Sequence, residues 1–283
     1  MKRSILLLLF SLQLILGAFA QTDTIFTNSE KILCTVKEVT TDAVKFVYPG
    51  EDIINSIYKN TVQKIVLHSG RVQTFAESTS YKTVNGAEDF ENVTLSSVES
   101  EVKGLFKLGD VSSKAKGTTT FSSMENVKER AIHKLKIVAA MMGANIVYLN
   151  QTTTTGNQMG TKYTAGHSTE TNLAGVAYSN ILPVYDDFIK LLGNKRDFKT
   201  DDILYLSQSD FDMSKPGYMV KLQILNFRNE NGLILVNGKI TTDDDESPET
   251  KVYDNLRVVH FTNDGFTLVN KNGASVYNYK FKM

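Results

Sequence analysis

A helix that runs directly into a buried strand constrains this chain more than any other feature. Apolar residues recur at steps of three or four, the spacing of one buried helix face: Val127, Ala131, Leu135, Val138 and Met142. The charged residues between them should face solvent: Lys128, Glu129, Lys134 and Lys136. The period then changes to that of a strand at residues 146–149. The connection is so short that the strand must pack back against the helix.

Two local signals mark the ends of this helix. Ser122 and Glu125 have the Ser-x-x-Glu spacing of a capping box, in which each side chain accepts the other residue's free backbone N–H. Gly143 stands where helices commonly end in a residue of left-handed conformation. We therefore predict a helix that starts next to Ser122 and ends at Gly143.

The N-terminus has the pattern of a signal peptide. Lys2 and Arg3 precede an apolar run over residues 5–16, and Gly17-Ala-Phe-Ala20 ends in the small-x-small pattern of a signal-peptidase site. We predict cleavage after Ala20 and export to the periplasm or the extracellular space. The run is short for a membrane span, and no cysteine lies near the cleavage site. We therefore expect neither a transmembrane segment nor a lipid anchor.

Charge and cysteine content narrow the classes of partner. The 31 basic residues are balanced by 31 acidic ones, which argues against nucleic acid or an anionic membrane surface as the partner. Cys34 is the only cysteine, so no disulfide can form within the chain. It lies in a strand-like run, where we expect a buried thiol, although an unpaired thiol in an oxidising compartment could join two chains.

The pattern predicts an α+β protein in three parts. Residues 21–77 should form a small β meander that curls into a half-barrel, with strands at 24–27, 31–39, 43–48, 56–58, 62–67 and 71–75. Residues 78–92 are polar and without period, which favours a linker. Residues 93–180 combine strands, the helix and a long hairpin tip, and residues 181–199 hold a connecting helix between Pro183 and Gly193.

The C-terminal part, residues 200–283, reads as an antiparallel meander or small barrel. Its hairpin connections, at residues 229–232, 263–265 and 270–273, are rich in Asn, Asp and Gly, which tolerate positive φ.

Three segments of the middle part form a recognisable pattern: Gly104-Leu-Phe-Lys-Leu-Gly-Asp-Val111, Ala139-Ala-Met-Met-Gly-Ala-Asn-Ile-Val147 and Gly175-Val-Ala-Tyr178. In their order and composition they resemble the YbjQ-like domain. The related outer-membrane Rcs stress-sensor lipoprotein domain shares the Gly-Ala-Asn-x-Val signature. The N-terminal β segment loosely resembles modules of exported bacterial proteins.

This resemblance implies a sheet-plus-helix fold in which Gly143, Ala144 and Asn145 are structural. The sensor relative implies envelope surveillance through protein contacts, and YbjQ-like proteins are often labelled heavy-metal binders. This chain lacks the sensor's disulfide cysteines and has no Cys or His cluster suited to a soft metal.

The sequence contains no recognisable catalytic constellation. Its four histidines, His68, His133, His167 and His260, lie in different elements without a second ligand at metal-binding spacing. There is no Gly-x-Ser-x-Gly elbow and no phosphate loop. The acidic run Asp243-Asp-Asp-Glu246 lacks the spacing of a calcium loop, which favours a solvated turn. We therefore predict no catalytic residue, metal or cofactor, although a triad assembled only by folding stays open.

The hairpin tip at residues 156–172 is the best candidate for function. Met159, Tyr163 and His167 are side chains of the kind that anchor protein contacts, and a merely polar, mobile loop is the alternative. We therefore expect an exported, non-catalytic binding or interaction protein of the bacterial cell envelope, with another envelope protein as partner.

Two other functions stay open. A carrier of a metal or a small apolar ligand would hold the latter in the C-terminal barrel, lined by Phe227, Val259 and Phe266. A hydrolase would bring a Ser or Asp to His68 or His260.

Overall fold

The computed structural model describes residues 22–27, 30–75, 81–243, 248–273 and 275–283. The predicted signal peptide lies outside this range. The chain divides into two compact units, Met1–Thr79 and Ser80–Met283. Strands dominate and helices are few, which is compatible with the α+β class. Among the described residues, no helix has both the length and the apolar composition needed to cross a bilayer.

The first unit is one antiparallel sheet of six strands in the order β4-β3-β2-β1-β5-β6. The strands and one 3-10 turn are β1 (Asp23–Thr27), β2 (Lys31–Val39), β3 (Ala43–Val47), β4 (Asn55–Tyr58), η2 (Lys59–Thr61), β5 (Val62–Val66) and β6 (Val72–Thr74). Alternate residues of β2 point inward, so Ile32 and Cys34 are buried while Leu33 is exposed. Burial, aided by the charge of Asp23, raises the pKa of the Cys34 thiol to about 11. The prediction of a buried thiol is therefore confirmed.

The second unit begins with a four-stranded sheet in the order β7-β9-β10-β8. Its elements are η4 (Ala87–Asn92), β7 (Thr94–Ser96), η5 (Glu99–Glu101), β8 (Phe106–Lys116), β9 (Ile146–Thr155) and β10 (Glu170–Ser179). β7 runs parallel to β9, whereas β10 pairs antiparallel with β8 and β9. β8 begins only at Phe106, after Gly104 with φ +80°. Gly109, with φ +133°, lies next to the register shift between β8 and β10.

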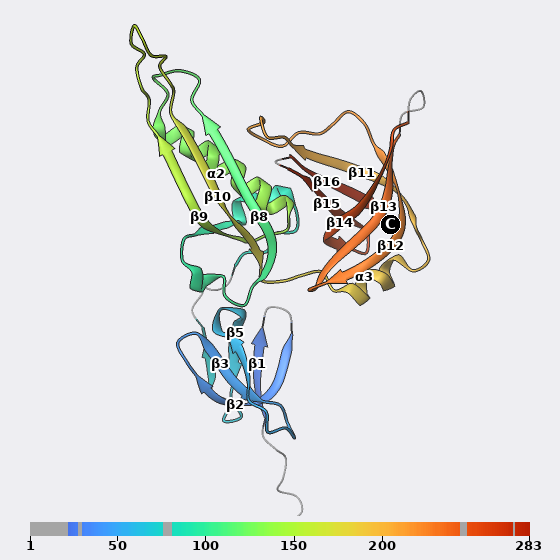
Figure 1. The fold of residues 1–283 in the computed structure, drawn as a ribbon. Coiled ribbons are helices and arrows are strands. Elements are labelled where there is room, and N and C mark those ends of the chain that lie inside the picture. The colour runs from blue at the N-terminus through green and yellow to red at the C-terminus, as the bar shows by residue number, and fades with distance from the viewer. Residues whose placement is uncertain (1–21, 28–29, 76–80, 244–247, 274) are drawn as a thin grey trace, which may run out of the picture. The chain divides into compact units, whose positions relative to one another are not determined.

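Helix α2 (Met124–Met141) lies against this sheet (Figure 1). Its predicted apolar stripe is buried throughout. The predicted capping box is wrong by one residue: Ser123 is the N-cap and accepts the N–H of Asn126, while Ser122 Oγ accepts the N–H of Thr119. The predicted C-terminal end is confirmed by Gly143, whose φ is +74°.

The remaining strands close into an antiparallel barrel (Figure 1). They are β11 (Asp197–Leu206), β12 (Val220–Glu230), β13 (Leu233–Thr242), β14 (Thr250–Thr262), β15 (Gly265–Asn272) and β16 (Ser275–Lys282). Helix α3 (Tyr185–Leu192) does more than connect, because its fully buried Phe188 packs on Phe227, Phe261 and Phe266 at ring-centroid distances of 6.0, 5.4 and 5.5 Å.

The sheet, α2 and the outer face of the barrel share one core. Outward side chains of the barrel join the buried residues of α2 in it, among them Leu204, Leu206, Val269 and Val276. This arrangement corrects the expectation that Lys134 faces solvent: its side chain is buried, and Nζ donates to the carbonyls of Ser207 and Gln208. Burial lowers the pKa of Lys134, and the charge of Asp210 acts in the opposite direction.

The segment expected to be a linker is also partly structural. Residues 76–80 lie outside the described range, but η4 contributes the buried Ala87 and the partly buried Phe90 to the shared core. The segment is polar because only a few of its side chains are needed to cover α2.

Candidate functional site

The outer halves of β9 and β10 and the turn between them form an arm, defined here as residues 150–172. Its two limbs continue beyond α2 in Figure 1. Thr155 pairs with Glu170, and Gln158 and His167 exchange backbone hydrogen bonds of 2.8 and 2.9 Å. Thr161 and Thr164 close the turn, with a backbone hydrogen bond of 2.8 Å and a second of 2.7 Å between their hydroxyls. The arm is therefore a hydrogen-bonded hairpin up to its turn.

Side-chain contacts fix the arm to the start of α2. Asn157 donates to the carbonyl of Ser122 and accepts from the N–H and the hydroxyl of Thr169. Gly160 and Gly166 lie so close that a Cβ on either would come within 3 Å of the other's backbone nitrogen. The sequence feature behind this close approach is therefore the pair of glycines, one in each limb.

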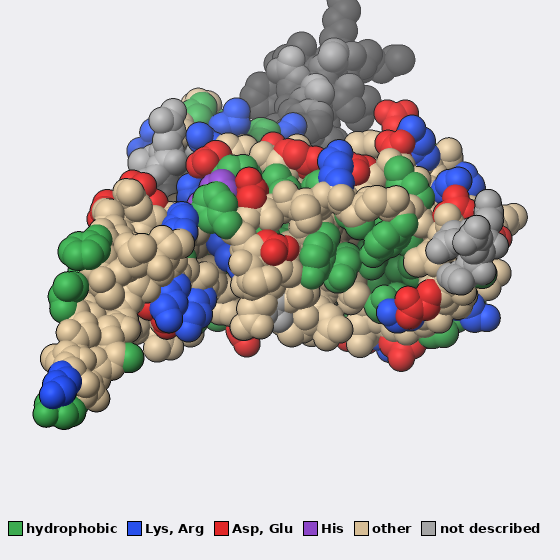
Figure 2. Space-filling view, turned by 90° about the horizontal axis from the view of Figure 1, so that it is seen from above, with side chains coloured by type: hydrophobic (Ala, Val, Ile, Leu, Met, Phe, Trp, Pro, Cys, Tyr) green, Lys and Arg blue, Asp and Glu red, His purple; other side chains and the backbone are tan. Residues whose placement is uncertain are grey.

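Large apolar side chains are exposed at two levels of the arm. Met159 and Tyr163 at the tip are 63% and 88% exposed, and Phe121 and Met124 beside its base are 80% and 50% exposed. Figure 2 shows hydrophobic side chains at the tip and again nearer the base. Exposed apolar groups gathered in one region commonly mark an interaction surface.

The predicted contact residues divide between tip and limb. Met159 and Tyr163 present their side chains to solvent, and Lys162 Nζ lies 5.9 Å from the Tyr163 ring centroid. His167 is exposed too, and its backbone pairs with Gln158. Sequence reasoning missed Phe121 and Met124, whose signal was an apolar pair flanking the N-cap of α2.

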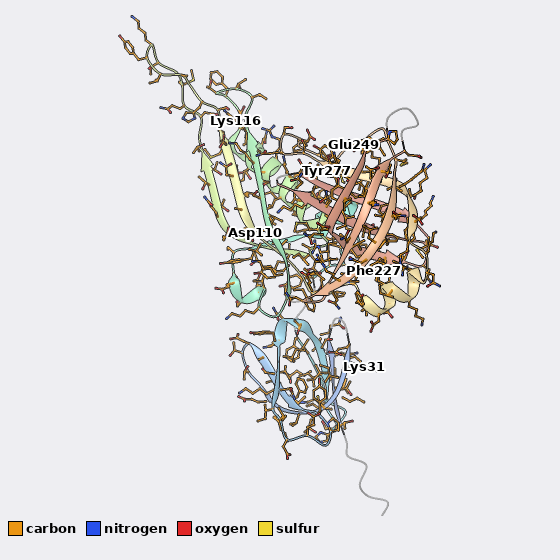
Figure 3. The ribbon with its side chains drawn as sticks, turned by 45° about the vertical axis from the view of Figure 1, so that its right-hand side comes forward. Lys31, Asp110, Lys116, Phe227, Glu249 and Tyr277 are labelled. Atoms are coloured by element: carbon orange, nitrogen blue, oxygen red, sulfur yellow. The ribbon has the colours of Figure 1, made fainter. Side chains whose placement is uncertain are left out.

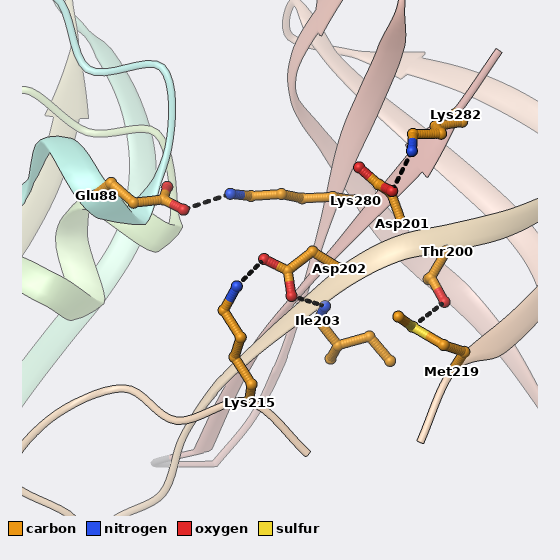
Figure 4. A network of polar contacts seen from close by, with 9 residues as sticks. All are labelled: Glu88, Thr200, Asp201, Asp202, Ile203, Lys215, Met219, Lys280 and Lys282. Atoms are coloured by element: carbon orange, nitrogen blue, oxygen red, sulfur yellow. Dashed lines mark hydrogen bonds and ion pairs between the residues drawn. The ribbon is translucent and has the colours of Figure 1, made fainter. Parts of the chain in front are cut away.

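A polar hollow of about 350 Å³ lies between η4 and the barrel, and its charged side chains are largely paired. Glu88 binds Lys280 and Asp201 binds Lys282, with the Asp202–Lys215 pair nearby (Figure 4). Burial lowers the pKa of His260, which also lines the hollow, and the charge of Asp89 opposes this. No serine or cysteine is among the described residues that line it.

A smaller hollow of about 270 Å³ is lined by Lys134 and by sheet residues, including Ser112, Lys114 and Asn172. Lys114 pairs with Glu170, and Lys134 is held by two carbonyls. Both lysine side chains of this hollow are thus held by partners within the chain.

His68 does meet an aspartate. Its Nδ1 lies 2.9 Å from Asp23 Oδ1, and the carboxylate also accepts the backbone N–H groups of His68 and Val36. The carboxylate thus ties β1 to β2 and to the end of β5. Another histidine, His133, packs between the rings of Phe90 and Phe211, at 4.8 and 5.0 Å.

The three residues proposed to line an apolar ligand cavity do not share one. Phe266 points into the barrel core, Phe227 packs on Phe188 at the α3 end, and Val259 packs outside the barrel in the shared core. Figure 3 shows Phe227 at that end of the barrel. Aromatic rings fill the interior, with Phe266 centroids 4.9 Å from Phe198 and 5.2 Å from Phe281. The predicted lining is therefore wrong.

Within the described residues, no group of three or more His, Cys, Asp or Glu side chains is placed to hold a metal ion. Three of the four acidic residues at 243–246 lie outside that part of the chain. The fourth, Asp243, accepts hydrogen bonds from Lys199 and Lys221, which lower its pKa to about 2.

Comparison of the chain with protein-family models, with curated proteins and with solved structures found no match.

Proposed function

We propose that this protein is an exported, non-catalytic binding protein of the bacterial cell envelope, and that the arm is its contact surface. The observation that carries the proposal is the pairing of a hydrogen-bonded hairpin with Met159 and Tyr163 exposed at its tip. A rigid presentation of aromatic and Met side chains lowers the entropy lost when a partner binds.

The wider assignment rests on sequence features. The signal-peptide pattern supports export. The Gly143-Ala-Asn145 junction between α2 and β9 supports a YbjQ-like central module at residues 93–180, flanked by a β meander and a small barrel. The sensor relatives of that module support a partner that is another envelope protein. A filled barrel interior weighs against the apolar-carrier alternative.

Site-specific photo-crosslinking tests the contact surface. A photoreactive phenylalanine analogue at Tyr163 or Met159 should give one discrete adduct with another envelope protein in living cells. The same analogue at Val252, an exposed apolar position on the barrel, is the matched control. The double variant Met159→Ser, Tyr163→Ser should lose the partner without a change in melting temperature, because both side chains are exposed. Equal labelling from all three positions would contradict the proposal.

A further inference from the structure

The arm also presents an open sheet edge along β9. β7 pairs only with Ile146, Val147 and Tyr148, so the rest of β9 has a neighbour on one side alone. Every second residue of such an edge directs its N–H and C=O away from its partner strand. The side chains of residues 150–153 and of Thr155 are exposed. This limb can therefore accept a further strand.

The β9 edge lacks the features that normally prevent strand addition. Residues 150–161 contain no charge and no proline, and four consecutive threonines favour the extended conformation. The opposite edge, β8, carries Lys107, Asp110, Lys114 and Lys116, two of which are labelled in Figure 3. Among the other described strands, β4, β6 and β7 are short edges of three or four residues, and the barrel is closed. The arm is the one long unprotected edge in the described part of the chain.

We propose that the occupant of this edge is the β9 limb of a second copy of this chain, added antiparallel about a two-fold axis. The inference rests on the proposed function, because it uses the same arm: the β9 limb pairs with a second copy, and the Tyr163 tip stays the contact for another envelope protein. A neutral edge fits a neutral strand, and self-pairing places threonine beside threonine with no charge facing another.

The fold also sets the register. A two-fold axis perpendicular to a sheet pairs one residue with its own counterpart. An axis close to Leu149 would drive the partner's limb into the space that β7 occupies beside Tyr148. An axis at Thr155 places Thr161, where the partner's limb ends, beside Leu149, so the paired limbs stop before Tyr148 and β7. Met159 of one copy comes to lie opposite Gln151 of the other, and Tyr163 in the turn stays outside the paired residues.

Two lysine variants of the purified full chain test the dimer. Sedimentation velocity should show a dimer for the parent chain and a monomer for Thr155→Lys, because the substitution places two like charges at the axis. Ser112→Lys is the matched control: it adds the same charge at an exposed position of β8 and should leave the dimer intact. A parent chain that stays monomeric at its highest soluble concentration overturns the proposal, as does a dimer that Thr155→Lys does not weaken.

Cysteine pairing tests the register. Cys34 is buried, so an introduced thiol is the reactive one. Thr155→Cys should form a disulfide-linked dimer under mild oxidation, because directly opposite residues have Cβ atoms about 5 Å apart. Thr153→Cys should not, because its two copies would lie about 13 Å apart along the strands. Equal cross-linking of both variants rules out the Thr155 axis. If the dimer forms but the photoreactive analogue at Tyr163 gives no adduct with another envelope protein, the result contradicts the proposed function and leaves the dimer proposal standing.

Discussion

At the scale of the residue, three hydrogen bonds to Asp23 join β1 to β2 and to the segment that follows β5. Its buried carboxylate accepts from the backbone N–H groups of Val36 and His68, both at 2.7 Å, and from His68 Nδ1. Burial alone would raise the pKa of Asp23, but these hydrogen bonds outweigh it and hold the pKa below the ordinary value of 3.8. Charged acceptors of this kind stabilise the folded state.

The lowered pKa predicts acid sensitivity in the first unit. A carboxyl whose folded pKa is below its unfolded pKa contributes its full stability above the unfolded value, and loses it as pH falls through the folded pKa. We expect Asp23→Asn to lower the free energy of unfolding by about 1–3 kcal/mol at pH 7, and by progressively less as pH falls from 3.8 towards the lower folded pKa. Urea unfolding at several pH values measures this difference. Asp52→Asn, at an exposed position between β3 and β4, is the control and should show the same stability difference from the parent chain, close to zero, at every pH.

At the scale of the element, α2 ends in a way that also positions it against the barrel. The N–H groups of Gly143 and Ala144 bond to the carbonyls of Ala140 and Ala139, which is the pattern of a Schellman motif. The next carbonyls receive donors from the barrel: Asn278 Nδ2 bonds to Met141 at 2.9 Å, and the Arg257 guanidinium bonds to Met142 at 2.7 Å. Burial lowers the pKa of Arg257 to about 10. A cation at a helix C-terminus is favourable because it complements the helix dipole.

Gly143 is the position where this arrangement is most sensitive. We expect Gly143→Ala to cost about 1–2 kcal/mol for the left-handed conformation and more for contact, since its Cβ would lie 2.9 Å from Val259 Cγ1. Denaturant unfolding of Gly143→Ala, Val259→Ala and the double variant separates the two costs. In the double variant Gly143→Ala should retain only the conformational cost. Simple additivity of the two substitutions would show that the contact with Val259 carries no energy.

At the scale of the whole molecule, the chain has two separate units, while α2 and the barrel belong to one of them. The first unit has its own core around Ile25 and Ile65. In the second unit, apolar side chains on the outside of the barrel join those of α2. β15 shows the consequence: four successive residues, Phe266 to Val269, are buried because the strand has a core on each face.

This organisation predicts which regions unfold together. Leu206→Ala, at a fully buried barrel position in the shared core, should cost about 2–5 kcal/mol and reduce hydrogen-exchange protection in α2 as well as in the barrel. Ile65→Ala should reduce protection only in the first unit. Mass spectrometry of amide exchange under native conditions measures both. Loss of protection confined to the barrel in Leu206→Ala would show that α2 and the barrel unfold separately.

The sequence by itself determined the local structure of this protein. The period of three to four residues located the buried face of α2, Gly143 located its end, and Asn-Gly and Asp-Gly pairs located hairpins of the barrel. These features depend on the conformational preferences of a few neighbouring residues, and these preferences can be read directly from the sequence. The exposed arm residues Met159 and Tyr163 could also be selected from the sequence, because they are large apolar side chains within a long polar connection.

Only the tertiary structure decided which distant part of the chain packs on each element. Lys134 has the spacing of a solvent-facing residue, but the loop after β11 places two carbonyls over its ammonium group. The short segment after Val93 pairs in parallel with β9 and leaves the rest of that strand as an open edge. The physical reason is that periodicity records whether a side chain is buried, whereas the identity of the burying partner depends on contacts between residues far apart in the chain.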